Sequence, residues 1–99
     1  MKVNWTPSAK KSFEQILDWL NEKWTNKEIE NFLDQTNSTI EQIKNNPYLY
    51  RVSEQNEQVR RGLLNRFISL YYRVRSKEEE IDLLIFWDNR QNPESNKYE

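Results

Sequence analysis

The segment FISLYYRVRSKEEEIDLLIFWD, residues 67–88, contains two runs of alternating side chains separated by a charged stretch. In residues 67–74 and again in residues 81–88, every second position is apolar, and the centre of the second run is apolar on both sides. A period of two residues is typical of β-strands, and a strand apolar on both faces belongs in a sheet interior. We therefore predict two strands that pair antiparallel, because the charged turn 75–80 between them is short.

Two amphipathic helices are predicted before these strands. Apolar side chains recur at intervals of three or four residues across residues 9–24 and again across residues 29–43, which is the spacing of one helix face. Thr6 followed by proline marks the first helix start, the capping box in residues 25–28 marks the second, and Pro47 ends the pair. Because their connection is so short, the helices are expected to lie antiparallel.

The order of elements predicts the fold class. Residues 2–5 and 59–64 are the remaining candidate strands, and the polar, aperiodic residues 48–58 are expected to form a loop. The expected fold is α+β, with the N-terminal strand and the antiparallel helix hairpin packed on one face of a small antiparallel sheet. Residues 1–90 are predicted to form a single domain, and residues 91–99 a mobile C-terminal tail.

The opposite face of this sheet is expected to lie open and to form a binding surface. Strand alternation places on it the side chains of Phe67, Ser69, Tyr71 and Arg73, beside Leu84 and Phe86 of the neighbouring strand. An exposed aromatic and apolar patch on a small domain usually marks a partner surface. The alternative is that the tail or the long loop folds over it. Trp19 lies off the apolar stripe of its helix and is a second candidate for an interface.

The composition excludes several kinds of chemistry. Cysteine and histidine are absent, so disulfides, thiolate or imidazole metal sites and the commonest general base are excluded. Catalysis would rest on Lys, Arg, Tyr, Asp or Glu, and we expect neither a cofactor nor a metal. The 13% aromatic content favours a folded core over disorder. No signal-like or membrane-spanning apolar run is present, so a cytoplasmic location without membrane contact is expected.

The charges are divided unevenly along the chain. Residues 47–77 hold seven cations against two carboxylates, whereas residues 78–99 hold two cations against seven carboxylates. Arginine, whose planar fork suits phosphate or carboxylate groups, occurs only from residue 51 onward. Exposed arginines are also common on strand hairpins. Arg90, just past the last strand, is either a site residue or an exposed strand end.

Four segments together resemble the RelE/ParE superfamily of bacterial toxins. The resemblance covers residues 3–93, and it is carried by VNWTPSAKKSFEQILDWL (3–20), IKNNP (43–47), SLYYRV (69–74) and IFWDNRQNP (85–93). The last segment is more similar to the ParE-like branch. This resemblance implies the toxin of a type II toxin–antitoxin pair, a growth inhibitor neutralised by a cognate antitoxin, with DNA contacted mainly through that antitoxin. It also implies a target: RelE-like toxins cleave mRNA on the ribosome, whereas ParE-like toxins poison DNA gyrase.

The resemblance further implies catalytic positions. RelE-like nucleases are similar to one another in having basic residues on the second strand, an arginine on the third, an arginine after the last strand and a tyrosine in the tail. Here Arg60, Arg90 and Tyr98 occupy three such positions, but Gly62 and Ser69 stand where further cations are expected. Converging cations stabilise charge on a scissile phosphate without a metal.

The resemblance leaves three possible functions. The first is a ParE-like toxin that binds a protein target such as DNA gyrase. The second is a RelE-like, metal-independent, ribosome-dependent mRNA endonuclease that uses Arg60, Arg90 and Tyr98. The third is an inactive relative that binds antitoxin and regulates the operon. The antitoxin is a partner in all three, and the residues predicted to bind target or antitoxin are Arg61, Phe67, Ser69, Tyr71, Arg73, Phe86 and Arg90.

Overall fold

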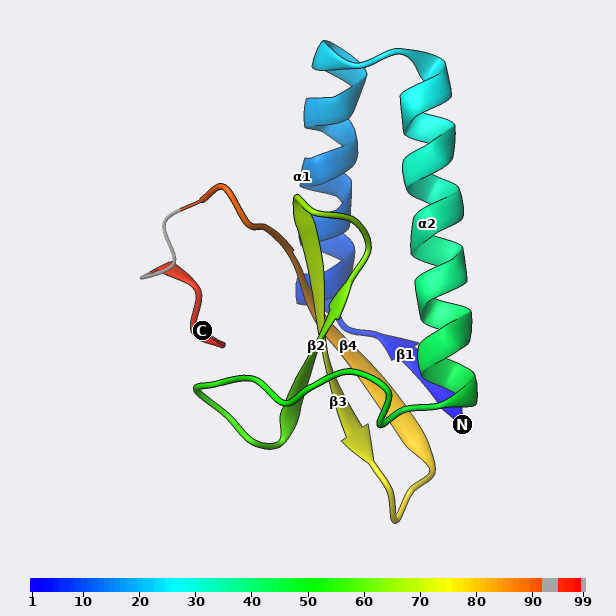
Figure 1. Cartoon of the computed structure of the whole chain (residues 1–99), viewed down its shortest axis with the longest axis vertical. Coiled ribbons are helices and arrows are strands. Elements are labelled where there is room, and N and C mark those ends of the chain that lie inside the picture. The colour runs from blue at the N-terminus through cyan, green and yellow to red at the C-terminus, as the bar shows by residue number, and fades with distance from the viewer. Residues whose placement is uncertain (92–94, 99) are drawn as a thin grey trace.

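The computed structural model describes residues 1–91 and 95–98 of the chain. Along these residues the elements are, in order, β1 (Lys2–Trp5), α1 (Pro7–Lys23), α2 (Asn26–Asn45), β2 (Val59–Leu63), β3 (Ile68–Arg75) and β4 (Glu80–Asp88). Figure 1 shows α1 and α2 as a hairpin that runs alongside the strands. The predicted α+β class and the predicted order of elements are confirmed.

The strands of the described chain form one sheet in the order β1-β4-β3-β2. As the short turns predict, β2 pairs antiparallel with β3, and β3 pairs antiparallel with β4. At the edge, β1 pairs parallel with β4, so the sheet is mixed rather than purely antiparallel. A parallel pair needs a long crossover, and here both helices and two strands separate β1 from β4 in the chain.

Each helix starts at a capping threonine. Thr6 Oγ1 accepts a hydrogen bond from Ala9 N at 3.2 Å and donates one to the Leu83 carbonyl oxygen at 2.7 Å. At the second helix, Thr25 and Glu28 form the predicted capping box. The first N–H groups of a helix have no partner within it, so these caps fix the starts. Thr6 also ties the start of α1 to β4.

An aromatic layer fills the space between the helix hairpin and the sheet. The ring centroid of Phe13 lies 5.6 Å from that of Phe32 and 5.0 Å from that of Phe86. Trp5 stacks on Phe86 at 5.2 Å. Such pairs stabilise a core beyond the area they bury. The buried aliphatic side chains around them are Ala9, Leu20, Ile43, Leu64, Ile68, Leu70, Ile81 and Leu83.

A β-bulge in β4 changes which of its side chains face the helices. Tyr71 pairs with Ile85 but Tyr72 pairs with Leu83, so Leu84 is an extra residue. Beyond this residue the alternation is shifted by one, as in any bulge of this kind. Phe86 therefore faces the helices and is only 2% exposed. The prediction that Phe86 lies on the open face is wrong.

The loop between α2 and β2 is fastened to the sheet by side chains. The Tyr72 hydroxyl donates to the Pro47 carbonyl oxygen at 2.7 Å, and burial raises the pKa of this phenol to about 12. Tyr72 is therefore protonated, and a donor, at neutral pH. Val52 forms an isolated antiparallel bridge with Arg60. The loop thus follows the outer edge of β2.

The described part of the C-terminal segment, residues 95–98, lies away from the helix hairpin. Figure 1 shows this segment on the far side of the strands from α2. Residues 92–94 and 99 of the tail that was predicted to be mobile lie outside the described residues. Within residues 1–91 and 95–98, no helix combines the length and the apolarity needed to cross a membrane.

The core predicts a clear contrast between two leucines of neighbouring strands. Leu70 in β3 is fully buried, whereas Leu63 in β2 is 50% exposed. We expect Leu70→Ala to lower the free energy of unfolding by about 2–5 kcal/mol, through lost burial and the cavity left behind. The matched control, Leu63→Ala, should change it by no more than about 0.5 kcal/mol. Urea denaturation followed by tryptophan fluorescence measures both; equal losses would contradict the assigned core.

Candidate functional site

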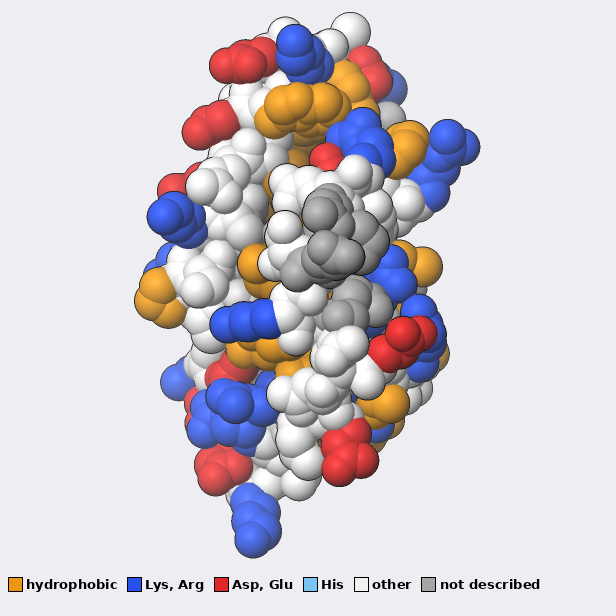
Figure 2. Space-filling view, turned by 90° about the vertical axis from the view of Figure 1, so that its left-hand side faces the viewer, with side chains coloured by type: hydrophobic (Ala, Val, Ile, Leu, Met, Phe, Trp, Pro, Cys, Tyr) orange, Lys and Arg blue, Asp and Glu red, His pale blue; other side chains and the backbone are white. Residues whose placement is uncertain are grey.

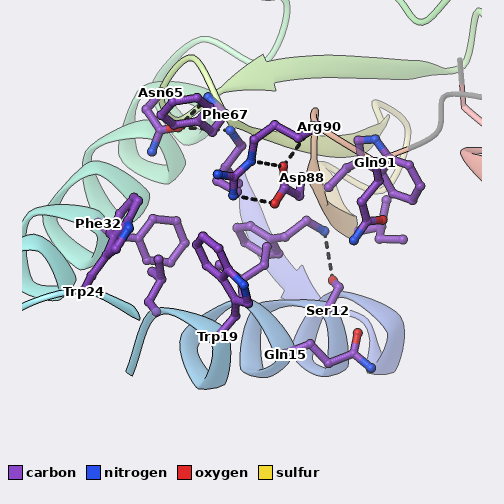
Figure 3. Close-up of a pocket in the computed structure, with 16 residues that line it drawn as sticks. Ser12, Gln15, Trp19, Trp24, Phe32, Asn65, Phe67, Asp88, Arg90 and Gln91 are labelled. Carbon is purple, nitrogen blue, oxygen red and sulfur yellow. Dashed lines mark hydrogen bonds and ion pairs between the residues drawn. The ribbon is translucent and has the colours of Figure 1, made fainter. Parts of the chain in front are cut away.

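A cleft of about 430 Å³ opens between α1, α2 and the end of the β3–β4 hairpin (Figure 3). Aromatic side chains form much of its wall, and a few polar groups stand among them. Ligand sites are typically about 300–1,000 Å³, mainly apolar, with a few placed polar groups. The cleft has these properties. Its aromatic and polar lining includes Ser12, Gln15, Trp19, Trp24, Phe32, Asn65, Phe67, Asp88, Arg90 and Gln91.

Arg90 is held in this cleft by a carboxylate and two aromatic rings. Its Nε and Nη2 donate to the two carboxylate oxygens of Asp88 at 2.9 and 2.7 Å. Its guanidinium carbon lies 4.7 Å from the ring centroid of Trp19 and 4.8 Å from that of Phe67. Bidentate pairing and stacking on aromatic faces both suit arginine. Arg90 is therefore part of a built cluster rather than a loose strand end.

The electrostatics of the cleft follow from this pair. The hydrogen bond from Arg90 lowers the pKa of the Asp88 carboxyl against the opposing effect of burial. The same hydrogen bond raises the pKa of Arg90. Both groups are charged at neutral pH, so the cleft contains a neutralised ion pair between aromatic walls. This arrangement suits the docking of a side chain or peptide better than proton transfer.

Phe67 lies in the cleft and not on the open sheet face where strand alternation placed it. It precedes β3, and Asn65 Oδ1 accepts hydrogen bonds from Phe67 N and Ile68 N at 2.8 and 3.0 Å. This local turn takes Phe67 out of the strand alternation. Its ring packs against the core cluster on the helix side. Trp19 lines the same cleft and is 37% exposed, a position consistent with the interface role proposed for it.

A polar network joins β2, β3 and the residue after β4 on the other face of the sheet. Arg61 Nε donates to Ser69 Oγ at 3.0 Å, and Arg61 Nη2 donates to Asn89 Oδ1 at 3.1 Å. Ser69 Oγ in turn donates to Asn89 Oδ1 at 2.9 Å. Ser69 lies on this face, as predicted, and Arg61 joins it there. Ser69 is fully buried, so its role here is to join strands.

Tyr71 lies on the same face but is fully buried beneath the C-terminal segment. The ring of Tyr98 stacks on it with centroids 5.4 Å apart and planes at 24°. Asn96 Nδ2 donates to the Tyr71 hydroxyl at 3.2 Å. The expectation of an exposed surface around Tyr71 is wrong, and the alternative that the tail folds over it is confirmed.

Arg73 is held in an ion-pair network at the other end of the sheet. Arg73 Nη2 and Arg75 Nε donate to Asp82 Oδ2 at 3.2 and 2.9 Å, and Asn4 Nδ2 donates to Asp82 Oδ1 at 3.1 Å. Burial raises the pKa of Asp82, but the hydrogen bonds from Arg75, Asn4 and Arg73 outweigh it, so the pKa is lowered. Arg73 is engaged in joining β3 to β4.

Arg60 points to the loop before β2. Its Nη1 donates to the Tyr50 carbonyl oxygen at 2.6 Å, and its guanidinium lies 5.0 Å from the Tyr48 ring centroid. The next position on this face, Gly62, also meets Tyr50: a Cβ there would lie 3.3 Å from the Tyr50 ring. A side chain at position 62 therefore requires the Tyr50 ring to shift by a few tenths of an ångström.

The three residues predicted for nuclease catalysis do not meet in the structure. Arg60 contacts the loop, Arg90 lies in the cleft and Tyr98 stacks on the opposite face. The sequence reasoning missed Asp88, Asn89 and Asn96, which hold the arginines and Tyr71. The Asp-Asn-Arg order after a predicted strand was a usable signal for the Asp88–Arg90 pair, whereas no sequence pattern marks Asn96.

Comparison with known families supports the resemblance found in the sequence. Residues 3–93 match the family described as ParE toxin of type II toxin-antitoxin system, parDE. A search of curated proteins gives no match.

The ion-pair network around Asp82 predicts a dependence of stability on acid pH. Because the folded-state pKa is lowered, the stabilisation is fully present above the unfolded-state pKa of about 3.9 and is lost as pH falls through the folded-state value. Asp82→Asn should lower the free energy of unfolding by about 2 kcal/mol at pH 7, and this deficit should shrink below about pH 4. Urea denaturation between neutral and acid pH measures both effects.

A control for this experiment is Glu54→Gln. Glu54 pairs with Arg51 at 3.9 Å, and both side chains are well exposed. Exposed pairs contribute little, so this variant should match the parent within about 0.5 kcal/mol at every pH. A deficit for Asp82→Asn that stays constant down to the acid limit would contradict the assigned ion pair.

Proposed function

The chain belongs to the ParE toxin family of type II toxin–antitoxin systems, and from this premise we propose that it acts by binding a protein target rather than by cutting RNA. The family implies a cognate antitoxin as a partner. DNA gyrase is the target we propose, because ParE-like toxins act on it. The RelE-like alternative requires a cluster of cations around one phosphate.

The dispersal of Arg60, Arg90 and Tyr98 is the observation that carries this proposal. A site that stabilises charge on a scissile phosphate needs donors preorganised around one point, and losing a single donor costs about 10²–10³ in rate. Each of these side chains has an intramolecular partner in a different part of the fold. Arg73, which lies four residues beyond Ser69 in β3, is paired with Asp82.

The surface charge agrees with a protein target. Among the described residues drawn on the face in Figure 2, basic and acidic side chains are interspersed, with apolar side chains visible between them. RNA-binding faces typically gather Lys and Arg into one patch or stripe. The basic residues of β3 are also matched by acidic residues of β4. This distribution supports protein recognition over RNA binding.

The cleft is the docking site that we propose for the antitoxin. Protein interfaces depend on a few residues, most often Trp, Tyr and Arg, that sit beside a pocket. Trp19, Phe67 and Arg90 all line this cleft, and the guanidinium of Arg90 lies over both rings. Of the residues predicted to bind antitoxin or target, Phe67, Phe86 and Arg90 line it. An apolar side chain of the antitoxin would bury its surface between these rings.

Two assays on the purified toxin distinguish the alternatives for its target. We expect micromolar toxin to inhibit DNA supercoiling by purified gyrase, because the proposed mechanism needs no ribosome. We expect the same toxin to leave mRNA intact on translating ribosomes. Cut message in the second assay, with supercoiling unaffected in the first, would overturn the proposal. Inhibition of neither process, with antitoxin binding retained, would indicate the inactive relative.

Substitutions in the cleft test the antitoxin site. Trp19→Ala and Arg90→Ala should each weaken binding of the antitoxin, taken from the gene beside the toxin, by about 10- to 100-fold, the effect of removing an interface hot spot. Arg51→Ala is the matched control, since Arg51 is exposed and makes one long ion pair, and it should bind within about twofold of the parent. Calorimetric titration measures the affinities. Unchanged affinity in both cleft variants would rule out this site.

A further inference from the structure

The C-terminal residues 95–98 make a set of specific contacts with the sheet face opposite the helices. The ring of Tyr98 stacks on Tyr71, and the amide of Asn96 donates to the Tyr71 hydroxyl at 3.2 Å. Ser53 Oγ, from the loop before β2, donates to the Tyr98 carbonyl oxygen. Asn96 is only 4% exposed. A polar side chain so deeply buried at the end of a chain belongs to an organised contact.

A local turn within residues 95–98 holds the segment in the conformation that makes this contact. Tyr98 N donates to Asn96 Oδ1 at 3.0 Å, which closes a local turn. This turn presents the amide of Asn96 and the ring of Tyr98 side by side, and both reach Tyr71. Lys97, between them, has its ammonium 5.2 Å from the Tyr98 ring. The contact therefore has a pattern, an amide followed two residues later by an aromatic ring.

The surface beneath the segment has the properties of a binding site. Tyr71 is fully buried, Tyr98 stacks on its ring, and Asn96 donates a hydrogen bond to its hydroxyl. Ser53 offers a hydroxyl donor beside it. An aromatic ring with polar groups at its edge is a typical recognition surface. This surface lies on the other face of the sheet from the cleft.

We propose that Tyr71 and Ser53 form a peptide-binding site that the chain's own residues 95–98 occupy. The external ligand is a peptide segment with the same pattern, an asparagine and an aromatic residue two positions later. Because the internal segment is tethered, its effective concentration is high and an external peptide must compete with it. The tail is therefore a built-in competitor that masks the site. This inference goes beyond the proposed function and does not depend on gyrase as the target.

The test uses the full-length chain and the synthetic octapeptide NPESNKYE, the sequence of residues 92–99. In the variant Asn96→Ala/Tyr98→Ala the internal segment loses its ring and amide contacts, so the site is unmasked. Titration with the peptide, followed by the NMR signals of Ser53 and Tyr71, should show saturable binding. Binding to the parent chain should be at least about tenfold weaker, because its own tail competes.

Two peptide controls define the recognised pattern. A peptide with alanine in place of the tyrosine should bind at least about tenfold more weakly, since the ring stack is lost. A peptide with alanine in place of the lysine should bind within about twofold, because that side chain touches the tyrosine ring and not the site. Equal weakening by both substitutions would contradict the proposed pattern.

A second variant keeps the test decisive if the double variant unfolds. Ser53→Ala removes the hydroxyl that holds the Tyr98 carbonyl and leaves the ring stack in place. It should shift the NMR signals of Tyr71 and Tyr98 toward those of a partly released tail. Octapeptide binding that is equal in parent and double variant, or absent from both, would overturn the proposal, as would unchanged Tyr71 and Tyr98 signals in Ser53→Ala.

Discussion

One extra residue in β4 determines which side chains of the last strand face the helices. The bulge at Leu84 brings Phe86 into register with Leu70, so the ring enters the aromatic layer. The same shift pairs Asp88 with Ile68 on the helix side of the sheet. From there Asp88 holds Arg90 between two rings of the cleft. The core and the candidate docking site therefore both depend on this single irregularity.

Much of the fold was predictable because its signals are local. Helix stripes, the capping threonines and the alternation of β3 are each readable within a few residues. The parallel pairing of β1 was not, since it joins residues nearly 80 positions apart, such as Asn4 and Asp82. The bulge was also hidden, because the apolar residues around Leu84 satisfy either register. Phe86 was misplaced for this reason, and Phe67 because the hydrogen bonds of Asn65 start the strand one residue later.

The candidate site was only partly predictable, because the sequence does not show which charged side chains pair across neighbouring strands. The division of charge between residues 47–77 and 78–99 suggested a surface of arginines available to bind phosphate or carboxylate groups of a partner. In the fold β3 and β4 are antiparallel neighbours, and the arginines of β3 pair with the carboxylates of β4. Their pairing shows that a charge imbalance along the sequence need not survive folding. The sequence indicates the position of Arg90 just past the last strand, but its partner Asp88 and the covering of Tyr71 required the tertiary structure.

The close approach of the Tyr50 ring to Gly62 couples strand β2 to the loop before it. A side chain at this position would press on the Tyr50 ring, and the carbonyl of Tyr50 is what Arg60 holds. Adding a lysine at position 62 would thus disturb the neighbouring cation that a nuclease also requires. A side chain at position 62 therefore requires the Tyr50 ring to shift by a few tenths of an ångström, next to the backbone that Arg60 holds. Any substitution at position 62 is thus transmitted to the loop before β2 and to the carbonyl group that Arg60 binds.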